Sequence, residues 1–158
     1  MRLLRASLLF SAVWAIGATP GSGGAQQSTP VLLRQFYGEL ALEVREAGGG
    51  ALHIAAADSQ RSVVVLLLRS DLARWADTAM RLVAVRSKEG RARALAEGPG
   101  VRGGSLSLTR VASAAKVTWT LFLADGDFVS VQTPLSEHEV RSLVAALKRL
   151  AGGAGRRS

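Results

Sequence analysis

The stretch VVVLLLRSDLARWADTAMRLV, residues 63–83, decides the fold of this chain. Its first six residues form an unbroken apolar run of strand length, which predicts a central strand covered on both faces. Ser70 then offers a hydroxyl group as a helix N-cap. The following residues show a helical period, and the apolar members are Leu72, Trp75, Ala76, Ala79 and Val83. We therefore expect a strand that leads into a helix lying against the sheet.

A second helix has the clearest start signal in the chain. Ser136 and Glu139 have the spacing of a capping box, in which each side chain accepts a backbone N–H of the other residue. Leu135 and Val140 stand at the two positions of a hydrophobic staple. The predicted buried stripe consists of Val140, Leu143, Val144, Leu147 and Ala151. Gly152 is expected to end this helix.

Alternation of apolar and polar residues predicts several strands. The segments are 39–45, 51–57, 105–111, 116–124 and 128–133, in addition to 63–68. Glycines 48–50 predict a turn between the first two, and Asp125-Gly126 predicts a two-residue type I′ turn before the last. Residues 86–104 are rich in glycine and basic residues, and their weak alternation leaves strand and loop both open.

These segments predict an α+β fold. We expect an antiparallel sheet of about six strands whose apolar faces are covered by two helices. Each half then runs strand, strand, strand, helix, and Trp75 falls where Leu143 falls in the second half. An internal duplication is one interpretation, although the identities are too few to support common descent. Residues 31–151 are expected to form one domain.

The N-terminus predicts export. Residues 1–5 are a short basic start and residues 6–18 an apolar run, which together are typical of a signal peptide and too short for a stable membrane span. Small residues place cleavage after Ala25, with Ala18 as the alternative. Residues 26–30 would then be a flexible lead-in and 152–158 a disordered tail. Periplasm and medium both remain open as destinations, as does retention of the segment as an anchor.

The charge of the chain admits two interpretations. There are 20 basic against 12 acidic residues, a net charge of +8, and cleavage removes only Arg2 and Arg5 from this excess. A functional attraction to a polyanion would use the basic segment 86–102, whose candidate residues are Arg86, Lys88, Arg91, Arg93 and Arg102. Alternatively, the abundance of Ala, Gly, Arg, Leu and Val reflects GC-rich coding. No cysteine is present, so disulfides and thiolate metal sites are excluded.

Motifs for chemistry are weak. Residues 98–103 fit G-x-G-x-x-G, but a strand rather than a helix is expected to follow, which favours a glycine-rich turn. Ser113 and Lys116 fit S-x-x-K inside a predicted hairpin loop. Glu137-His138-Glu139 is explained by capping and by the helix dipole rather than by a metal. We therefore expect no catalytic residue, no metal site and no cofactor.

The remaining side chains favour ordinary structural roles. His53 is expected on the solvated face of its strand. Trp75 and Trp119 fall on apolar faces, so both are expected in the core, whereas Phe122 lies on the face opposite Trp119 and suits two-sided burial or a partner surface equally.

The leading hypothesis is an exported, non-catalytic binding module that contacts an envelope protein through a sheet face or edge. The alternative is an anion-binding module that uses residues 86–102 for an acidic polymer or lipid headgroups. A third hypothesis is an enzyme that acts on a small ligand in a pocket between sheet and helix. Export argues against nucleic acid, and the sequence gives no oligomeric state.

Overall fold

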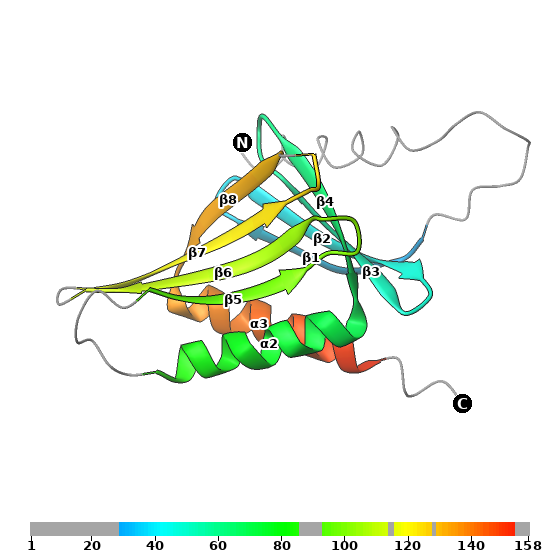
Figure 1. The fold of residues 1–158 in the computed structure, drawn as a ribbon. Coiled ribbons are helices and arrows are strands. Elements are labelled where there is room, and N and C mark those ends of the chain that lie inside the picture. The colour runs from blue at the N-terminus through cyan, green and yellow to red at the C-terminus, as the bar shows by residue number, and fades with distance from the viewer. Residues whose placement is uncertain (1–28, 86–92, 114–115, 128, 154–158) are drawn as a thin grey trace, which may run out of the picture.

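The computed structural model describes residues 29–85, 93–113, 116–127 and 129–153 (Figure 1). The first half contains β1 (Val31–Tyr37), β2 (Leu40–Gly48), β3 (Ala51–Ala57), β4 (Ser62–Leu68) and α2 (Arg69–Ala84). The second contains β5 (Arg93–Pro99), β6 (Ser105–Ala112), β7 (Val117–Ala124), β8 (Ser130–Leu135) and α3 (Glu137–Gly152). The expected signal peptide, most of the lead-in and residues 154–158 of the expected tail lie outside the described residues.

The predicted α+β class is confirmed, but the strand count and the single sheet are not. Within the described residues there are two antiparallel sheets of four strands each, in the orders β1-β2-β3-β4 and β5-β6-β7-β8. Figure 1 shows the two sheets inclined toward each other above both helices. Each half therefore has four strands before its helix, one more than predicted. The additional strands are the first of each half: β1, which the pattern missed, and β5, which lies in the segment left open between strand and loop.

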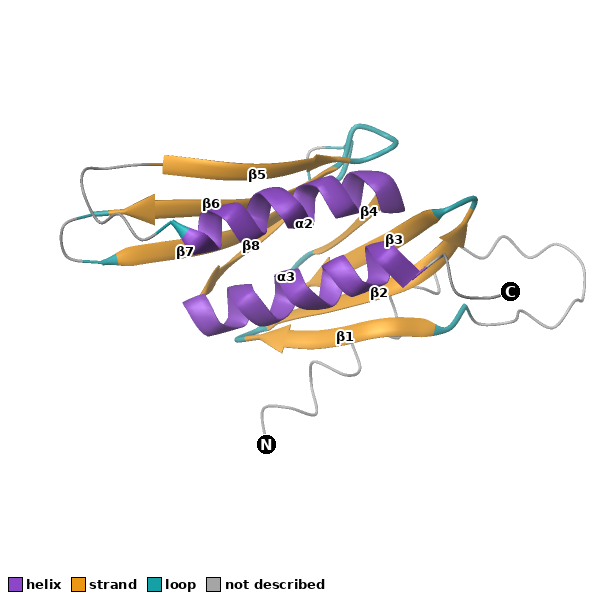
Figure 2. Cartoon of the chain, turned by 90° about the horizontal axis from the view of Figure 1, so that it is seen from below, coloured by secondary structure: helices purple, strands orange, loops and turns teal. Residues whose placement is uncertain are grey.

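Each helix covers the sheet of the opposite half. Figure 2 shows α2 lying along β5 of the second sheet and α3 lying over the strands of the first sheet. One continuous core joins both sheets and both helices. At Gly98 of β5, a Cβ atom would come within 3.3 Å of Leu67 and of Trp75. The absence of a side chain there lets the Trp75 ring of α2 pack directly on the strand.

The apolar run of 63–68 is not a central strand, so that prediction is wrong. β4 is an edge strand that pairs only with β3 within its sheet. Val63, Val65 and Leu67 point into the core, whereas Val64 and Leu68 are 38% and 40% exposed. The run is apolar on both faces, yet only one face is covered by the core.

The start of α2 also differs from its prediction. Strand β4 continues into the helix with no intervening residue, so Leu68 occupies the N-cap position and no side chain caps the helix. Ser70 instead lies inside the first turn. The Arg69 N–H donates to the Gly50 carbonyl at 2.9 Å, which satisfies one of the free donors of the helix start. The predicted buried stripe of α2 is confirmed in all five positions.

Helix α3 begins as predicted. Ser136 and Glu139 form both hydrogen bonds of the capping box, with Ser136 N to Glu139 Oε2 at 2.7 Å and Glu139 N to Ser136 Oγ at 3.3 Å. Four of its five predicted stripe residues are buried, and Ala151 is partly buried. The helix includes Gly152 and is capped by Gly153.

The predicted glycine turn between β2 and β3 is confirmed, whereas the predicted two-residue turn between β7 and β8 is wrong. Gly48, Gly49 and Gly50 all have positive φ, which side chains disfavour, and they connect β2 to β3. The connection from β7 to β8 spans residues 125–129 rather than two residues. Asp125 Oδ1 accepts the N–H groups of Asp127 and Val129 at 2.9 and 3.0 Å, so an Asp side chain closes this loop.

Two arginines each bind the C-terminal end of the helix that belongs to the other half of the chain. The Arg69 guanidinium at the start of α2 donates to the Leu150 carbonyl near the end of α3 and to the Glu46 carboxylate of β2. Arg110 of β6 donates from Nη2 to the Val85 carbonyl at the end of α2, at 3.2 Å. Each guanidinium therefore lies at the negative end of the helix from the other half.

We expect Ser136→Ala to lower the free energy of unfolding by about 1 kcal/mol, because it removes the cap of α3. Ser142→Ala, at an exposed position on the same helix, is the matched control and should change it little. Urea denaturation measures both. Equal stability of the two variants would show that the capping box contributes nothing.

The only tyrosine of the chain gives a pH test. Burial, and secondarily the Glu139 carboxylate, raise the pKa of Tyr37 to about 12. The unfolded chain ionises near pH 10, so the folded state binds more protons between these values. Stability from this group should be complete below pH 10 and decline as the pH rises toward 12. Phenolate absorbance should titrate near 12 in the folded protein and near 10 in denaturant, and coincident titrations would contradict the burial.

Candidate functional site

An apolar strip lies on the face of the first sheet that points away from the core. Val64, Leu66 and Leu68 share this face of β4, and Leu66 is half-buried. Val101, in the loop between β5 and β6, is 52% exposed and donates its N–H to the Leu66 carbonyl at 2.8 Å. We call these four residues the β4 strip.

The equivalent strand of the second half lacks such a strip. β4 and β8 both begin with a serine that pairs with the last alanine of the preceding strand. Counted from these serines, Gln132 stands where Val64 stands, and Pro134 where Leu66 stands. The fold therefore accepts glutamine and proline at these outward positions. Packing of the core does not explain why β4 has valine and leucine there.

One histidine and one arginine border the β4 strip. His53 pairs in register with Leu66, and together with Arg102 it lines a cavity of about 240 Å³ beside the strip. Burial, and then the Arg102 charge, lower the pKa of His53 below its ordinary value, so His53 is neutral at pH 7. His53 is thus partly buried at the border of an apolar surface, where a solvated side chain was expected.

The loop that carries Arg102 is held by a close approach of two turns. A Cβ atom on Gly126 would collide with the Arg102 carbonyl oxygen, and Gly100 N donates to Gly104 O at 2.6 Å. The G-x-G-x-x-G motif of 98–103 is accordingly a glycine-rich turn that leads into β6. No helix follows it to hold a phosphate group.

The basic candidates from the sequence are placed only in part. Arg86, Lys88 and Arg91 lie outside the described residues. Arg93 begins β5, and Arg102 follows the other end of that strand, about 20 Å away at the usual rise of a strand. The two positions therefore lie toward opposite ends of β5.

The remaining motifs have structural roles. Ser113 Oγ donates to the Lys116 carbonyl at 3.0 Å and accepts the Lys116 N–H at 3.3 Å, which closes the hairpin between β6 and β7. Glu137 pairs with Arg141 at 2.7 Å. The described residues contain no group of three His, Cys, Asp or Glu that could hold a metal ion. Nor do they include a helix long and apolar enough to cross a membrane.

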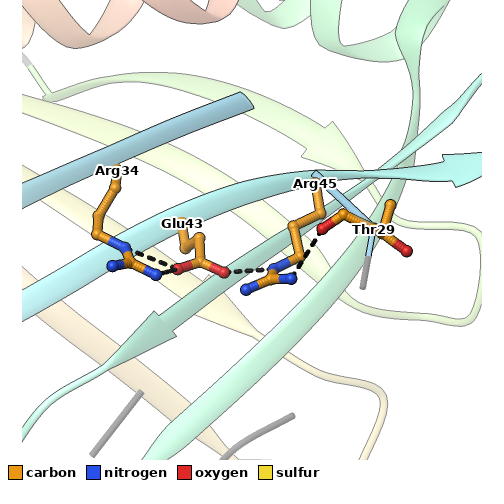
Figure 3. A network of polar contacts seen from close by, with 4 residues as sticks. All are labelled: Thr29, Arg34, Glu43 and Arg45. Carbon is orange, nitrogen blue, oxygen red and sulfur yellow. Dashed lines mark hydrogen bonds and ion pairs between the residues drawn. The ribbon is translucent and has the colours of Figure 1, made fainter. Parts of the chain in front are cut away.

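Sequence reasoning missed a buried ion network on the same outward face (Figure 3). Glu43 of β2 is fully buried and accepts from Arg34 Nε at 2.8 Å and from Arg45 Nε. Arg45 Nη1 also donates to the Thr29 carbonyl at 2.9 Å. Both carboxylate oxygens of Glu43 are engaged by guanidinium groups, so this residue is structural and is not a general base.

A larger cavity lies at the junction of the helix ends, where the C-terminal end of α2 meets the N-terminal end of α3 over β6 and β7. Its volume is about 700 Å³. Trp119 is 3% exposed in its wall, which confirms its predicted place in the core together with Trp75. Phe122, on the opposite face of β7, is partly exposed.

We expect Glu43→Gln to lower the free energy of unfolding by about 3 kcal/mol, because it removes the fully buried carboxylate that binds both Arg34 and Arg45. Glu137→Gln removes one partner of an exposed pair and should cost less than about 1 kcal/mol. Thermal unfolding of the two variants measures the difference. A Glu43→Gln protein as stable as Glu137→Gln would show that the network does not hold the strands.

No protein-family model matches the sequence, and no curated protein is similar to it.

Proposed function

We propose that this chain is an exported, non-catalytic module that binds an envelope protein through the β4 strip. The observation that carries the proposal is the difference between the two halves: β4 presents Val64 and Leu66 outward where β8 presents Gln132 and Pro134. Exposed apolar residues on an edge strand favour unwanted association, and natural sheets usually avoid them. A partner surface accounts for their presence here.

The mode of contact is against the face of the strand. The Leu66 carbonyl is already bonded to Val101, and β4 lies against β7 and β8 of the second sheet. A new strand therefore has little room at this edge. Side chains of the partner would instead pack across Val64, Leu66 and Leu68, where burial of aliphatic surface supplies the affinity.

Charge at the border indicates the chemistry of the partner segment. Arg102 is exposed beside the strip, and the chain as a whole has a net charge of +8. His53 is neutral and half-buried, so Arg102 provides the local positive charge. We infer that the partner segment is apolar with a carboxylate at one end, since opposite charge at the border of an interface fixes its register.

A photo-crosslinking residue placed at position 64 tests this proposal in the intact envelope. Val111 is the matched control, because it is the same residue type, 40% exposed, on the outward face of β6. We expect a single protein adduct from position 64 and none from position 111. The crosslinked segment should contain an acidic residue, and Arg102→Gln should reduce the yield.

Three outcomes would overturn the proposal. They are equal adducts from both positions, no adduct from position 64, and an adduct only with a second copy of this chain. An adduct whose yield is unchanged by Arg102→Gln would contradict the inferred chemistry of the segment. Binding of an acidic polymer that falls with salt but not with Val64→Gln would favour the anion-binding alternative instead.

A further inference from the structure

The cavity beside the β4 strip narrows the choice of partner segment. Its volume is about 240 Å³, and its lining includes His53, Val64, Leu66, Arg102, Gly104 and Gly126. We propose that it holds the C-terminal residue of the partner protein, with the α-carboxylate bound by Arg102 and an aliphatic side chain against Val64 and Leu66. This inference rests on the proposed function, since it names the part of the partner that enters the same site.

Arg102 is an exposed cation without a counter-ion in the described part of the chain. It forms no ion pair there, whereas Arg34, Arg45 and Arg69 each bind a carboxylate. Burial and, secondly, the Arg102 charge lower the pKa of His53, which lines the same cavity. Guanidinium groups remain protonated at ordinary pH values and bind carboxylates through paired N–H donors. Charge complementarity therefore favours a carboxylate at this position.

The backbone that carries this cation is held beside the strip. Val101 donates its N–H to the Leu66 carbonyl at 2.8 Å. On the other side of the loop, the missing side chain of Gly126 leaves room for the Arg102 carbonyl oxygen. Because these contacts exist before a ligand arrives, binding requires less ordering of the loop.

The volume of the cavity suits a single residue. Pockets for drug-sized ligands usually enclose about 300–1,000 Å³, which is more than this cavity offers. An apolar cavity of about 150 Å³ is already large enough for benzene. A volume of about 240 Å³ therefore accommodates one aliphatic side chain together with an adjoining carboxylate.

The mixed lining favours a chain end over an internal acidic residue. Val64 and Leu66 contribute aliphatic surface to the cavity that Arg102 borders. In an extended internal segment, the neighbours of an aspartate or glutamate point to the opposite face, so its carboxylate enters without an aliphatic group. A C-terminal residue has both groups on one Cα atom, and capture of C-terminal carboxylates is a recurring mode of peptide recognition. The acidic residue expected in the crosslinked segment is then the terminal one, which carries the free α-carboxylate.

Three short peptides test the site in the full chain. Acetyl-Ala-Ala-Val-Leu with a free carboxylate is the expected ligand, and its C-terminal amide lacks the charge. Acetyl-Ala-Asp-Val-Leu-amide has an internal carboxylate instead. The chain contains two histidines, so NMR spectra of their rings compare His53 at the cavity with His138 on α3 as an internal control. We expect the free acid to shift the His53 signals saturably and to leave those of His138 unchanged. The other two peptides should bind roughly tenfold more weakly.

Two arginine variants assign the carboxylate contact. Arg102→Gln should weaken binding of the free acid roughly tenfold and leave binding of the amide unchanged, because only the free acid has the charge. Unchanged binding of the amide also shows that the variant is folded. Arg149→Gln removes the same charge from an exposed position of α3 outside the cavity, and it should change neither affinity.

The crosslinking experiment at position 64 separates this inference from the proposed function. An adduct with the C-terminal peptide of the partner supports both. An adduct with an interior peptide would overturn the inference and leave the proposed function standing, whereas the absence of any adduct would overturn the proposed function. The inference is also wrong if the free acid does not bind, if the amide binds equally well, or if Arg102→Gln leaves the affinity for the free acid unchanged.

Discussion

The exchange of helices between the two halves is the constraint on which the rest of the structure depends. Because α2 lies on the second sheet and α3 on the first, the core is continuous across both halves. Packing of Trp75 against Gly98 shows how closely a helix of one half approaches a strand of the other. The helix ends meet the opposite half as well, through Arg69 and Arg110, so each half completes the polar contacts of its neighbour.

Local patterns predicted the elements that are amphipathic by themselves. The stripes of both helices and the capping box of Ser136 and Glu139 follow from periodicity and spacing alone. β1 was missed because a register shift between Val31 and Leu33 interrupts its alternation. β5 was left open because its inward residues include Ala96 and Gly98, which are small so that α2 can pack on them. The features that hid β5 are therefore the ones that tertiary packing requires.

The candidate sites could be predicted less well, because they depend on register and on contacts between halves. A six-residue apolar run looks the same at the centre and at the edge of a sheet, so the outward exposure of Val64 required the strand order. Alternation places Glu43 on the face opposite Leu42 and Val44, and its arginine partner on β1 emerges only from the pairing of Arg34 with Glu43. Arg110 did carry a signal, since alternation places it on the apolar face with Leu106 and Leu108.

The two helix-end junctions reverse their charges. Arg69 and Glu137 stand at the same position in their helices, and Glu46 and Arg110 pair with corresponding residues of β3 and β7. In the first half the helix supplies the cation, and in the second half the strand does. What both junctions share is a guanidinium on a carbonyl at the end of the other helix. The architecture thus places one arginine at each junction, from a helix at one and from a strand at the other. The residues around the two junctions can therefore differ while both arginines still join the halves.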